Sequence, residues 1–343
     1  MQKVLTILIP VYNTEKYIKR CLDSILLNEV LDDIEVLTVS DGSKDNSVNI
    51  IKEYIKKYPN TLKLIEKENG GHGSTINKGI EVATGKYFKV LDSDDWFNSI
   101  DFVKFVKRLK NENADLVVTN YCQEHVYSQS EVIYKYKDLK DEKVYIFDKF
   151  DLNLLNYEYF VMATSTYKLD VLKNSELHLL EKTFYVDMQY NIEPIININT
   201  FVYYDLDIYR YYIGRKDQSV NTASFVKNQD HHERVMKHLI EYYTNYQNNY
   251  SEVKKKYVEM ILLYMLYTHY TIYLSYDKNH KKSYKKIKKF DKWFKEKNTE
   301  LYMKVNTYGI IKFYRKIKFI YINKYLKKIL LILKKRSFMA GEF

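Results

Sequence analysis

Three carboxylates crowd into four residues in the first third of the chain. The run YFKVLDSDDWF, residues 87–97, starts as an apolar strand and then places Asp92, Asp94 and Asp95 directly after it. Like charges at this spacing repel one another, so a cation is expected among them in the working protein. Closely spaced aspartates on a loop suit a hard divalent ion, Mg²⁺ or Mn²⁺, whose remaining ligands are phosphate oxygens. The alternative is a set of surface acids in which Asp95 caps the next helix.

These acids need a framework, and the first 120 residues show a regular pattern. Apolar, β-branched runs alternate with segments of helical spacing. This alternation predicts an α/β fold of the Rossmann-like kind, with a mostly parallel sheet and helices on both faces. Ligands of such sheets bind beyond the carboxyl ends of the strands. We expect strands at 4–10, 34–39, 62–65, 86–91 and 116–119, and helices at 15–27, 45–57, before 83 and at 99–111.

Polar residues follow four of these strands at the predicted ligand edge. The run NGGHG at 69–73 lies between a strand and a helix, so its backbone amides could cradle a phosphate group. An ordinary tight loop is the alternative, and His72 is given no role. The four polar groups are Tyr12 with Asn13, 41–43, 69–74 and 92–95.

Four motifs carry a resemblance to a known family. ILIPVYNTEKYIKRCLDSI, SDGSKDNS, ENGGHGSTINKGIEVATGKY and VLDSDDW occur in an order and spacing similar to the family 2 glycosyltransferases of the GT-A fold, over about the first 100 residues. The resemblance implies an N-terminal half that binds a nucleoside diphosphate sugar, most often a uridine one. It also implies that Asp92 and Asp94 hold the divalent cation, with Asp94 as the more direct ligand. A cation there would stabilise the charge of the departing diphosphate.

The resemblance extends to further residues at the nucleotide sugar. Segment 209–220, YRYYIGRKDQSV, is similar to the family's closing segment and implies Arg215 as a phosphate contact, since a guanidinium suits phosphate. A solvated loop is the alternative. Ile76 stands where the family commonly has Arg, so diphosphate binding would rely more on the metal and on Arg215. The implied binding set is Pro10, Val11, Tyr12, Asn13, Asp41, Asn69, Gly70, Gly71, Asn77, Asp92, Ser93, Asp94, Arg215, Gln218 and Ser219.

A catalytic base is expected from the later half of the chain. The run KTFYVDMQYNIEPI, residues 182–195, resembles the family segment that carries the base and implies this role for Asp187. The base would take the proton of the acceptor hydroxyl on the face of the sugar opposite the leaving group, as an inverting transfer requires. Val186 stands where the family usually has Glu. Asp187 as an ordinary helix-start residue is the alternative, with Glu193 and Asp205 as other base candidates.

Contacts with the acceptor or the sugar are expected from residues beside the acidic run. Asp95 and Trp96 are assigned to this group, together with His125. Trp96 fits equally well as a core residue of the helix that follows.

Composition sets the general class of the protein. With 343 residues, 46% of them apolar and 29% charged, the chain is expected to be globular. Cys21 and Cys122 are the only cysteines, which argues against a disulfide framework or a cysteine zinc site and suits a reducing cytoplasm. The N-terminal apolar run reads as a first strand rather than a signal peptide.

The net charge of +11 is concentrated at the C-terminus. Residues 301–343 hold eleven Lys or Arg and one acid, so the first 300 residues are almost neutral. This distribution argues against a nucleic-acid-binding protein. Residues 308–336 contain no acid and interleave apolar and basic residues. We expect an amphipathic helix on an anionic membrane surface, and a helix packed on the domain is the alternative.

Three parts are expected along the chain: a catalytic domain at 1–222, a helical extension at 223–300 and the basic tail at 301–343. The uncharged stretch 260–276 is expected to be a buried helix rather than a membrane span.

Together these features predict an inverting, metal-dependent glycosyltransferase that uses a UDP-sugar. Its acceptor would be a glycan or a lipid-linked glycan in cell-surface polysaccharide or glycoconjugate synthesis. We expect it in the cytoplasm, on the inner face of the cell membrane. The alternative is a non-catalytic nucleotide-sugar-binding subunit of an assembly complex.

Overall fold

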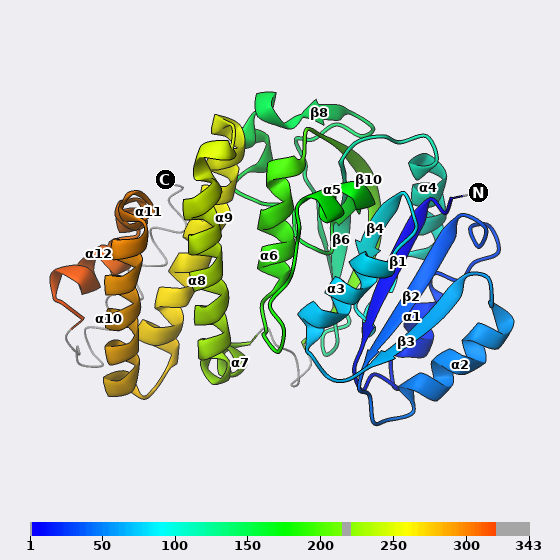
Figure 1. The fold of residues 1–343 in the computed structure, drawn as a ribbon, viewed down its shortest axis with the longest axis horizontal. Helices are drawn as coiled ribbons and strands as arrows, with labels where there is room; N and C mark the ends of the chain where they lie inside the picture. The colour runs from blue at the N-terminus through cyan, green and yellow to red at the C-terminus, as the bar shows by residue number, and fades with distance from the viewer. Residues whose placement is uncertain (1, 215–220, 320–343) are drawn as a thin grey trace. The chain divides into compact units, whose positions relative to one another are not determined.

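The computed structural model describes residues 2–214 and 221–319 (Figure 1). The chain divides into two compact units: residues 1–218 with 250–254, and residues 219–249 with 255–343. The division falls near the boundary expected at residue 222. Beyond it, the two C-terminal parts expected from the sequence belong to one unit.

Unit 1 is built on a ten-stranded sheet with the order β3-β2-β1-β4-β9-β6-β10-β5, in which β7 pairs with β6 and β8 with β10. Six strands, β1 to β4, β6 and β10, run in one direction, which confirms the mostly parallel sheet. The strands are β1 Leu5–Val11, β2 Ile34–Asp41, β3 Leu62–Lys67, β4 Tyr87–Val90, β5 Trp96–Phe97, β6 Leu116–His125, β7 Glu131–Tyr134, β8 Val144–Ile146, β9 Ser165–Lys168 and β10 Thr200–Ile213.

The register of the central strands brings their carboxyl ends to one level. In the parallel ladder β1 lies between β2 and β4, with Val11 opposite Ser40 and Leu8 opposite Val90. The chain therefore leaves β1, β2 and β4 at the same edge of the sheet, as expected for a ligand-binding edge.

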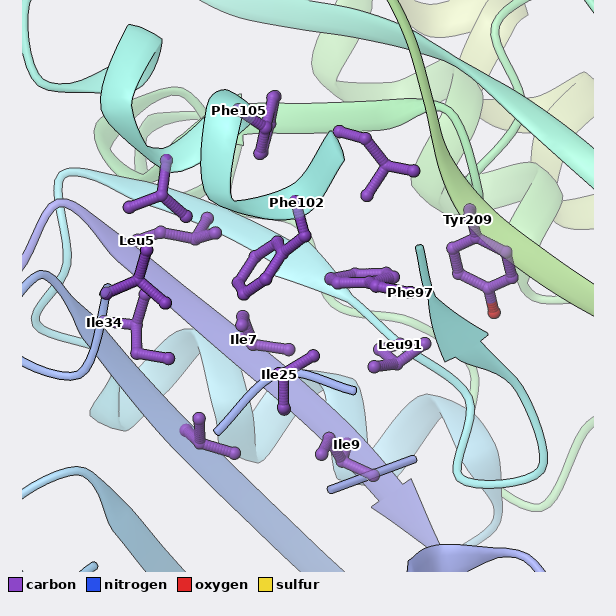
Figure 2. Close-up of a cluster of buried hydrophobic side chains, with 14 of the residues drawn as sticks. Leu5, Ile7, Ile9, Ile25, Ile34, Leu91, Phe97, Phe102, Phe105 and Tyr209 are labelled. Atoms are coloured by element: carbon purple, nitrogen blue, oxygen red, sulfur yellow. The ribbon is translucent and has the colours of Figure 1, made fainter. Parts of the chain in front are cut away.

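Helices cover both faces of this sheet, as predicted. Alternate residues of β1 point to opposite sides. Ile7 and its neighbours on one side pack with Phe102 and Phe105 of α4 (Figure 2). On the other side Leu8 meets α3 so closely that a Cβ on Gly79 would lie 2.6 Å from its side chain. The helices of unit 1 are α1 Ile18–Asp23, α2 Ser47–Lys57, α3 His72–Val82, α4 Ser99–Leu109, α5 Leu169–Asn174 and α6 Asp187–Ile192.

The start of α4 excludes the alternative in which Asp95 caps this helix. The side chain of Asn98, not of Asp95, caps this helix, since Asn98 Oδ1 accepts hydrogen bonds from the amides of Ile100 and Asp101. Such caps stabilise a helix start by about 1 kcal/mol. Asp95 is thereby left for a different role.

Unit 2 is helical, which confirms the helical C-terminal region. Residues of the uncharged stretch 260–276 such as Ile261, Leu266 and Tyr270 are buried. Among the described residues, none of the helices is long and apolar enough to cross a membrane. The helices are α7 Thr222–Lys227, α8 Gln229–Tyr246, α9 Glu252–Thr271, α10 His280–Lys297, α11 Thr299–Lys304 and α12 Gly309–Lys316, with a π-helical turn at Ile272–Tyr276.

The first part of the basic tail is a packed piece of unit 2. Arg315 of α12 donates through Nε to Asp291 Oδ1 at 2.7 Å, and its guanidinium lies 3.5 Å from the ring centre of Tyr302. For α12 this packing favours the alternative of a helix packed on the domain, and contact of the basic tail with a membrane stays a prediction. Residues 320–343 of the expected amphipathic helix lie outside the described residues.

Two histidines make unit 2 sensitive to acid. His232 of α8 and His269 of α9 share a buried Nδ1–Nδ1 hydrogen bond of 3.0 Å. Burial lowers the pKa of His232 to about 4 and holds the pKa of His269 well below its ordinary value. Unfolded histidines take up protons below about pH 6.5. The stability of unit 2 is therefore expected to be complete above pH 6.5 and to fall toward pH 4, by about 1.4 kcal/mol per pH unit for each such histidine.

Hydrogen exchange of the α8 and α9 amides between pH 7 and pH 5, corrected for intrinsic rates, measures this loss. The exposed His178 provides the control, because His178→Asn should leave the pH dependence unchanged. Protection that stays constant over this range would contradict the prediction.

Candidate active site

The acidic run follows β4 as a tight loop at the carboxyl edge of the sheet. The amide of Asp95 donates to the carbonyl of Asp92 at 2.9 Å and closes the turn. Asp92 and Asp94 are half-buried, whereas Ser93 and Asp95 are buried. The two members of the D-x-D pattern are therefore the acids of this loop that solvent or a ligand can reach.

Asp95 anchors the loop to β10. Its carboxylate accepts hydrogen bonds from the hydroxyl of Tyr209 and from the amide of Tyr212, both at 2.8 Å, and the residue is 1% exposed. Burial raises the pKa of Asp95 well above its usual value, and the charges of Asp94 and Asp92 raise it further. Both carboxylate oxygens of Asp95 are thus engaged within the protein, and its contact with the acceptor stays a prediction.

Helix α1 holds the loop from the other side. Arg20 donates to the carbonyl of Asp94 at 3.1 Å, and its guanidinium lies 3.6 Å from the ring centre of Trp96 and 4.5 Å from that of Tyr212. This stacking combines a cation–π interaction with a backbone hydrogen bond. Trp96 also lines a shallow cavity of about 430 Å³ with Asn98 and other polar residues. His125 ends β6, where its amide pairs with the Ser130 carbonyl.

His72, which the sequence left without a role, links the acidic loop to the expected base. It is the first residue of α3, and its Nε2 lies 3.0 Å from Asp92 Oδ1. Burial lowers the pKa of His72, but its hydrogen bond with Asp92 and the charges of Asp92, Asp187 and Asp94 together raise it above the ordinary value. The neighbouring carboxylates therefore favour the protonated form of this histidine.

Asp187 is brought to the same place by α6, of which it is the first residue. Burial raises its pKa, the positive charge of His72 opposes this, and the charge of Asp92 adds to it. The side chain keeps partial access to solvent. A carboxyl group with a raised pKa is a better proton acceptor than an ordinary aspartate, provided that it is ionised.

The two other base candidates are occupied elsewhere. Glu193 is 4% exposed and accepts from Gln189 Nε2 at 3.0 Å. Asp205 accepts from Lys135 Nζ and from Asn120 Nδ2, both at 2.7 Å. Each of these carboxylates already accepts hydrogen bonds from the side chains named, so Asp187 remains the candidate.

In the NGGHG loop, which was expected to cradle a phosphate group, two backbone amides bind a carboxylate of the protein. Its amides at Gly70 and Gly71 donate to the two carboxylate oxygens of Asp41, both at 2.8 Å, and Lys67 Nζ lies 3.0 Å from Asp41 Oδ1. Asn69 donates to the backbone carbonyl of Asp41 at 2.9 Å. A buried carboxylate needs such donors. Asp41, which is 3% exposed, therefore shapes the loop, and its contact with the nucleotide sugar stays a prediction.

Asn77, another residue of the expected binding set, binds the backbone of a distant segment. Its side chain donates to the carbonyl of Leu179 at 2.9 Å and accepts from the amide of Leu179 at 2.8 Å. The neighbouring amide of Lys182 donates to the carbonyl of Gly70. A Cβ on Gly73 would lie 2.6 Å from the Leu180 carbonyl oxygen, so only glycine allows this approach. The start of α3 is thus joined to the segment that leads into Asp187.

The remaining expected binding residues fall into three groups. Pro10 and Val11 are buried within β1, so their side chains are not available to a ligand. Tyr12 is 52% exposed beyond the strand, and Asn13 accepts from the Lys44 amide at 2.8 Å. Arg215, Gln218 and Ser219 lie outside the described residues.

The residues present fit a divalent metal at the acidic loop. Asp92 and Asp94 offer accessible carboxylate oxygens, the donor type that Mg²⁺ and Mn²⁺ prefer. Another acidic group, Cys122 with Glu124 and Glu131, has its ligand atoms within 4.8 Å of one another. There Arg210 Nη1 lies 3.0 and 3.1 Å from the two glutamates and already supplies the positive charge.

Asn77 is expected to position the base without touching the substrate. Asn77→Ala removes both hydrogen bonds to Leu179 and should lower kcat about tenfold or more, because small misplacements of a catalytic group are costly. The KM for the donor should change less than twofold. Steady-state kinetics measure both constants, and Lys78→Ala, on the next position of α3, is the matched control. A rise in KM with kcat unchanged would instead indicate a direct contact with the donor.

The mostly parallel sheet, with helices on both faces and the acidic loop at its carboxyl edge, is the architecture of the GT-A fold. The solved structure of S. aureus TarS 1–349 shares this fold, with a TM-score of 0.62 and 16% identity, over 88% of this chain and 83% of that one. Its complex with UDP-GlcNAc matches with a TM-score of 0.62 and 17% identity, over 87% and 82% of the two chains.

Residues 6–172, just under half of the chain, match the family model described as Glycosyl transferase family 2. GlyA, a glycosyltransferase of Streptococcus pneumoniae serotype 4, is 37% identical over 41% of this chain and 20% of its own. The uncharacterized glycosyltransferase MG025 of Mycoplasma genitalium is 33% identical over 53% of this chain and 64% of its own. The poly(ribitol-phosphate) beta-glucosyltransferase of Bacillus spizizenii is 37% identical over 33% and 18%. The chain spans less than two thirds of the length of the curated relatives that it matches.

Proposed function

We propose that this protein is an inverting, metal-dependent glycosyltransferase that moves a sugar from a UDP-sugar to a hydroxyl of a glycan or lipid-linked acceptor. The observation that carries the proposal is the meeting of Asp92, His72 and Asp187. Asp92, at the end of β4, lies within hydrogen-bond distance of His72. Asp187, on α6, interacts with the same histidine through its charge. This arrangement supports a role for Asp187 as the base beside the departing diphosphate.

Asp187 would act on the acceptor. Its carboxylate accepts the proton of the attacking hydroxyl as the new glycosidic bond forms. The hydroxyl oxygen bonds to the anomeric carbon while the bond from that carbon to the diphosphate breaks, so the configuration inverts. His72 favours the ionised form of Asp187 through its positive charge.

Asp92 and Asp94 would serve the leaving group. They would hold Mn²⁺ or Mg²⁺, and the bound ion would neutralise the charge that develops on the diphosphate. Asp95, Tyr209 and Arg20 keep the backbone of the loop in place, so the two carboxylates need not reorganise during the reaction. Tyr12 and Asn13 lie at the end of β1 and are the candidates for contacts with the uridine.

The nature of the donor and the acceptor is supported by the relatives. UDP-GlcNAc is the ligand named for the TarS complex, and a poly(ribitol-phosphate) beta-glucosyltransferase is among the relatives. These names favour a UDP-sugar and a cell-surface polymer or glycoconjugate. We place the enzyme at the cytoplasmic face of the membrane, where residues 320–343, rich in Lys and Leu, would contact anionic lipid.

Turnover of a panel of UDP-sugars, with Mn²⁺ and with EDTA, tests the proposal. We expect release of UDP from one of them, and loss of this release with EDTA. Binding of UDP-sugars without hydrolysis or transfer to any acceptor of a glycan panel would contradict catalysis and favour a binding subunit. Full activity in EDTA would contradict the metal.

A further inference from the structure

A groove of about 650 Å³ lies within unit 2, apart from the residues of the active site. Its floor is aromatic, since Tyr284 of α10 and Phe319 are 5% and 8% exposed. Its rim is basic, and none of the residues that line it is acidic. The lining residues are His280, Lys281, Tyr284, Lys285, Lys288, Lys318 and Phe319.

Helix α10 concentrates positive charge on this groove. The helix holds nine lysines and two acids, so the near-neutral average of the first 300 residues conceals a strongly basic element. Lys281, Lys285 and Lys288 are spaced by four and three residues, which places them on one face of the helix. All three are exposed. Such a row attracts a partner with several negative charges.

The acids of α10 do not neutralise this face. Asp291 is buried and accepts from Arg315, and Glu296 lies 3.8 Å from Lys292. Within the described part of the chain, Lys281, Lys285, Lys288 and Lys318 have no ion-pair partner; we refer to these four residues as the groove lysines. The α10 lysines with an ion-pair partner are Lys286, Lys292 and Lys297, and none of them lines the groove.

The chain's own C-terminal segment is a poor occupant of the groove. Residues 320–343 follow Phe319 directly and carry six Lys or Arg with one acid. A segment of that charge would be repelled by the groove lysines. The same charge makes the segment and the groove suited to one anionic partner.

We propose that this groove binds the phosphate headgroups of an anionic membrane. Lysine ammonium groups at the rim would contact the phosphates, and the aromatic floor at Tyr284 and Phe319 would meet the apolar part of the interface. A purely polar polyanion has no apolar group to pack on that floor. The lipid surface is therefore favoured over a phosphate polymer. The site is formed by α10 together with Lys318 and Phe319, and it adds to any contact made by residues 320–343.

Vesicle sedimentation with the full chain tests the proposal. Lys285→Gln/Lys288→Gln removes two groove lysines, and Lys282→Gln/Lys289→Gln is the matched control, because these two exposed lysines lie on a different side of the same helix. On vesicles of phosphatidylglycerol and phosphatidylcholine, the groove variant should partition about 25-fold less, at about fivefold per lysine. The control should lose less than about threefold. UDP-sugar hydrolysis without vesicles should be unchanged in both variants.

Equal loss in the two variants, or no loss in either, would overturn the proposal, because the membrane contact would then be diffuse or confined to residues 320–343. The same two variants are to be measured with inorganic polyphosphate in solution. Loss of polyphosphate binding with vesicle binding retained would assign the groove to a phosphate polymer and would also overturn it. None of these outcomes depends on whether the enzyme transfers sugar, so a failure here is distinct from a failure of the proposed catalysis.

Discussion

Asp187→Asn should lower sugar transfer by about 10²–10⁴-fold, the usual contribution of a general base. The amide keeps the size of the side chain but cannot accept the proton of the acceptor hydroxyl. Binding of the UDP-sugar and Mn²⁺ should change less than threefold, because the base acts on the acceptor. Transfer assays and isothermal titration calorimetry measure the two quantities on the same sample.

A matched control exists in unit 1. Asp170 is also an acid in the first turn of a short helix, α5, and it is exposed. Asp170→Asn removes the same charge from the first turn of a helix, so it reports any general effect of losing an acid at a helix start. Transfer at the normal rate by Asp187→Asn would disprove the base assignment.

Asp94→Asn should abolish the dependence of UDP binding on Mn²⁺ and lower transfer by about 10²–10³-fold, as expected for the loss of one group that stabilises the developing charge. The backbone of the loop should stay in place, since Arg20 and Asp95 hold it through groups that the substitution does not remove. Titration of UDP with and without Mn²⁺ gives the measurement.

Glu131→Ala is the control for this prediction. Glu131 belongs to the other acidic group, in which Arg210 already provides the positive charge. Its removal should leave metal-dependent UDP binding intact. If Asp94→Asn binds UDP with the same Mn²⁺ dependence as the unmodified protein, Asp94 is not a metal ligand.

The regular half of the sheet was predictable because its signals are local. Strands β1 to β4 and β6 are apolar runs whose ends are marked by polar residues, and each is joined to the next by a helix. The later strands carry no such signal. β9 has four residues and lies antiparallel between β4 and β6, and its place depends on pairing with Tyr87 and Val117, far away in the sequence. The Tyr-rich β10 has no alternation that identifies it as a central strand.

The candidate active site shows the same difference between residues with a local sequence signal and residues placed by distant contacts. The carboxylate side chains and the resemblance to the family pointed to Asp92, Asp94 and Asp187. The partners of these acids come from distant segments: Tyr209 is 114 residues from Asp95, and Leu179 is 102 residues from Asn77. No local pattern reports such contacts.

Two residues of the expected binding set are bound by backbone groups that no local sequence pattern reveals. The amides of Gly70 and Gly71 donate to the carboxylate of Asp41. The amide of Leu179 donates to the side chain of Asn77. Both residues therefore hold the active-site loops in position.

The most direct test is a crystal structure of the protein with UDP and Mn²⁺, in which the anomalous signal of manganese locates the ion. We predict one ion bound by the carboxylate of Asp94, with Asp92 beside it and the diphosphate oxygens completing its ligands at about 2.0–2.2 Å. UDP bound at this edge of the sheet with no ion at either carboxylate would contradict metal-assisted departure of the nucleotide.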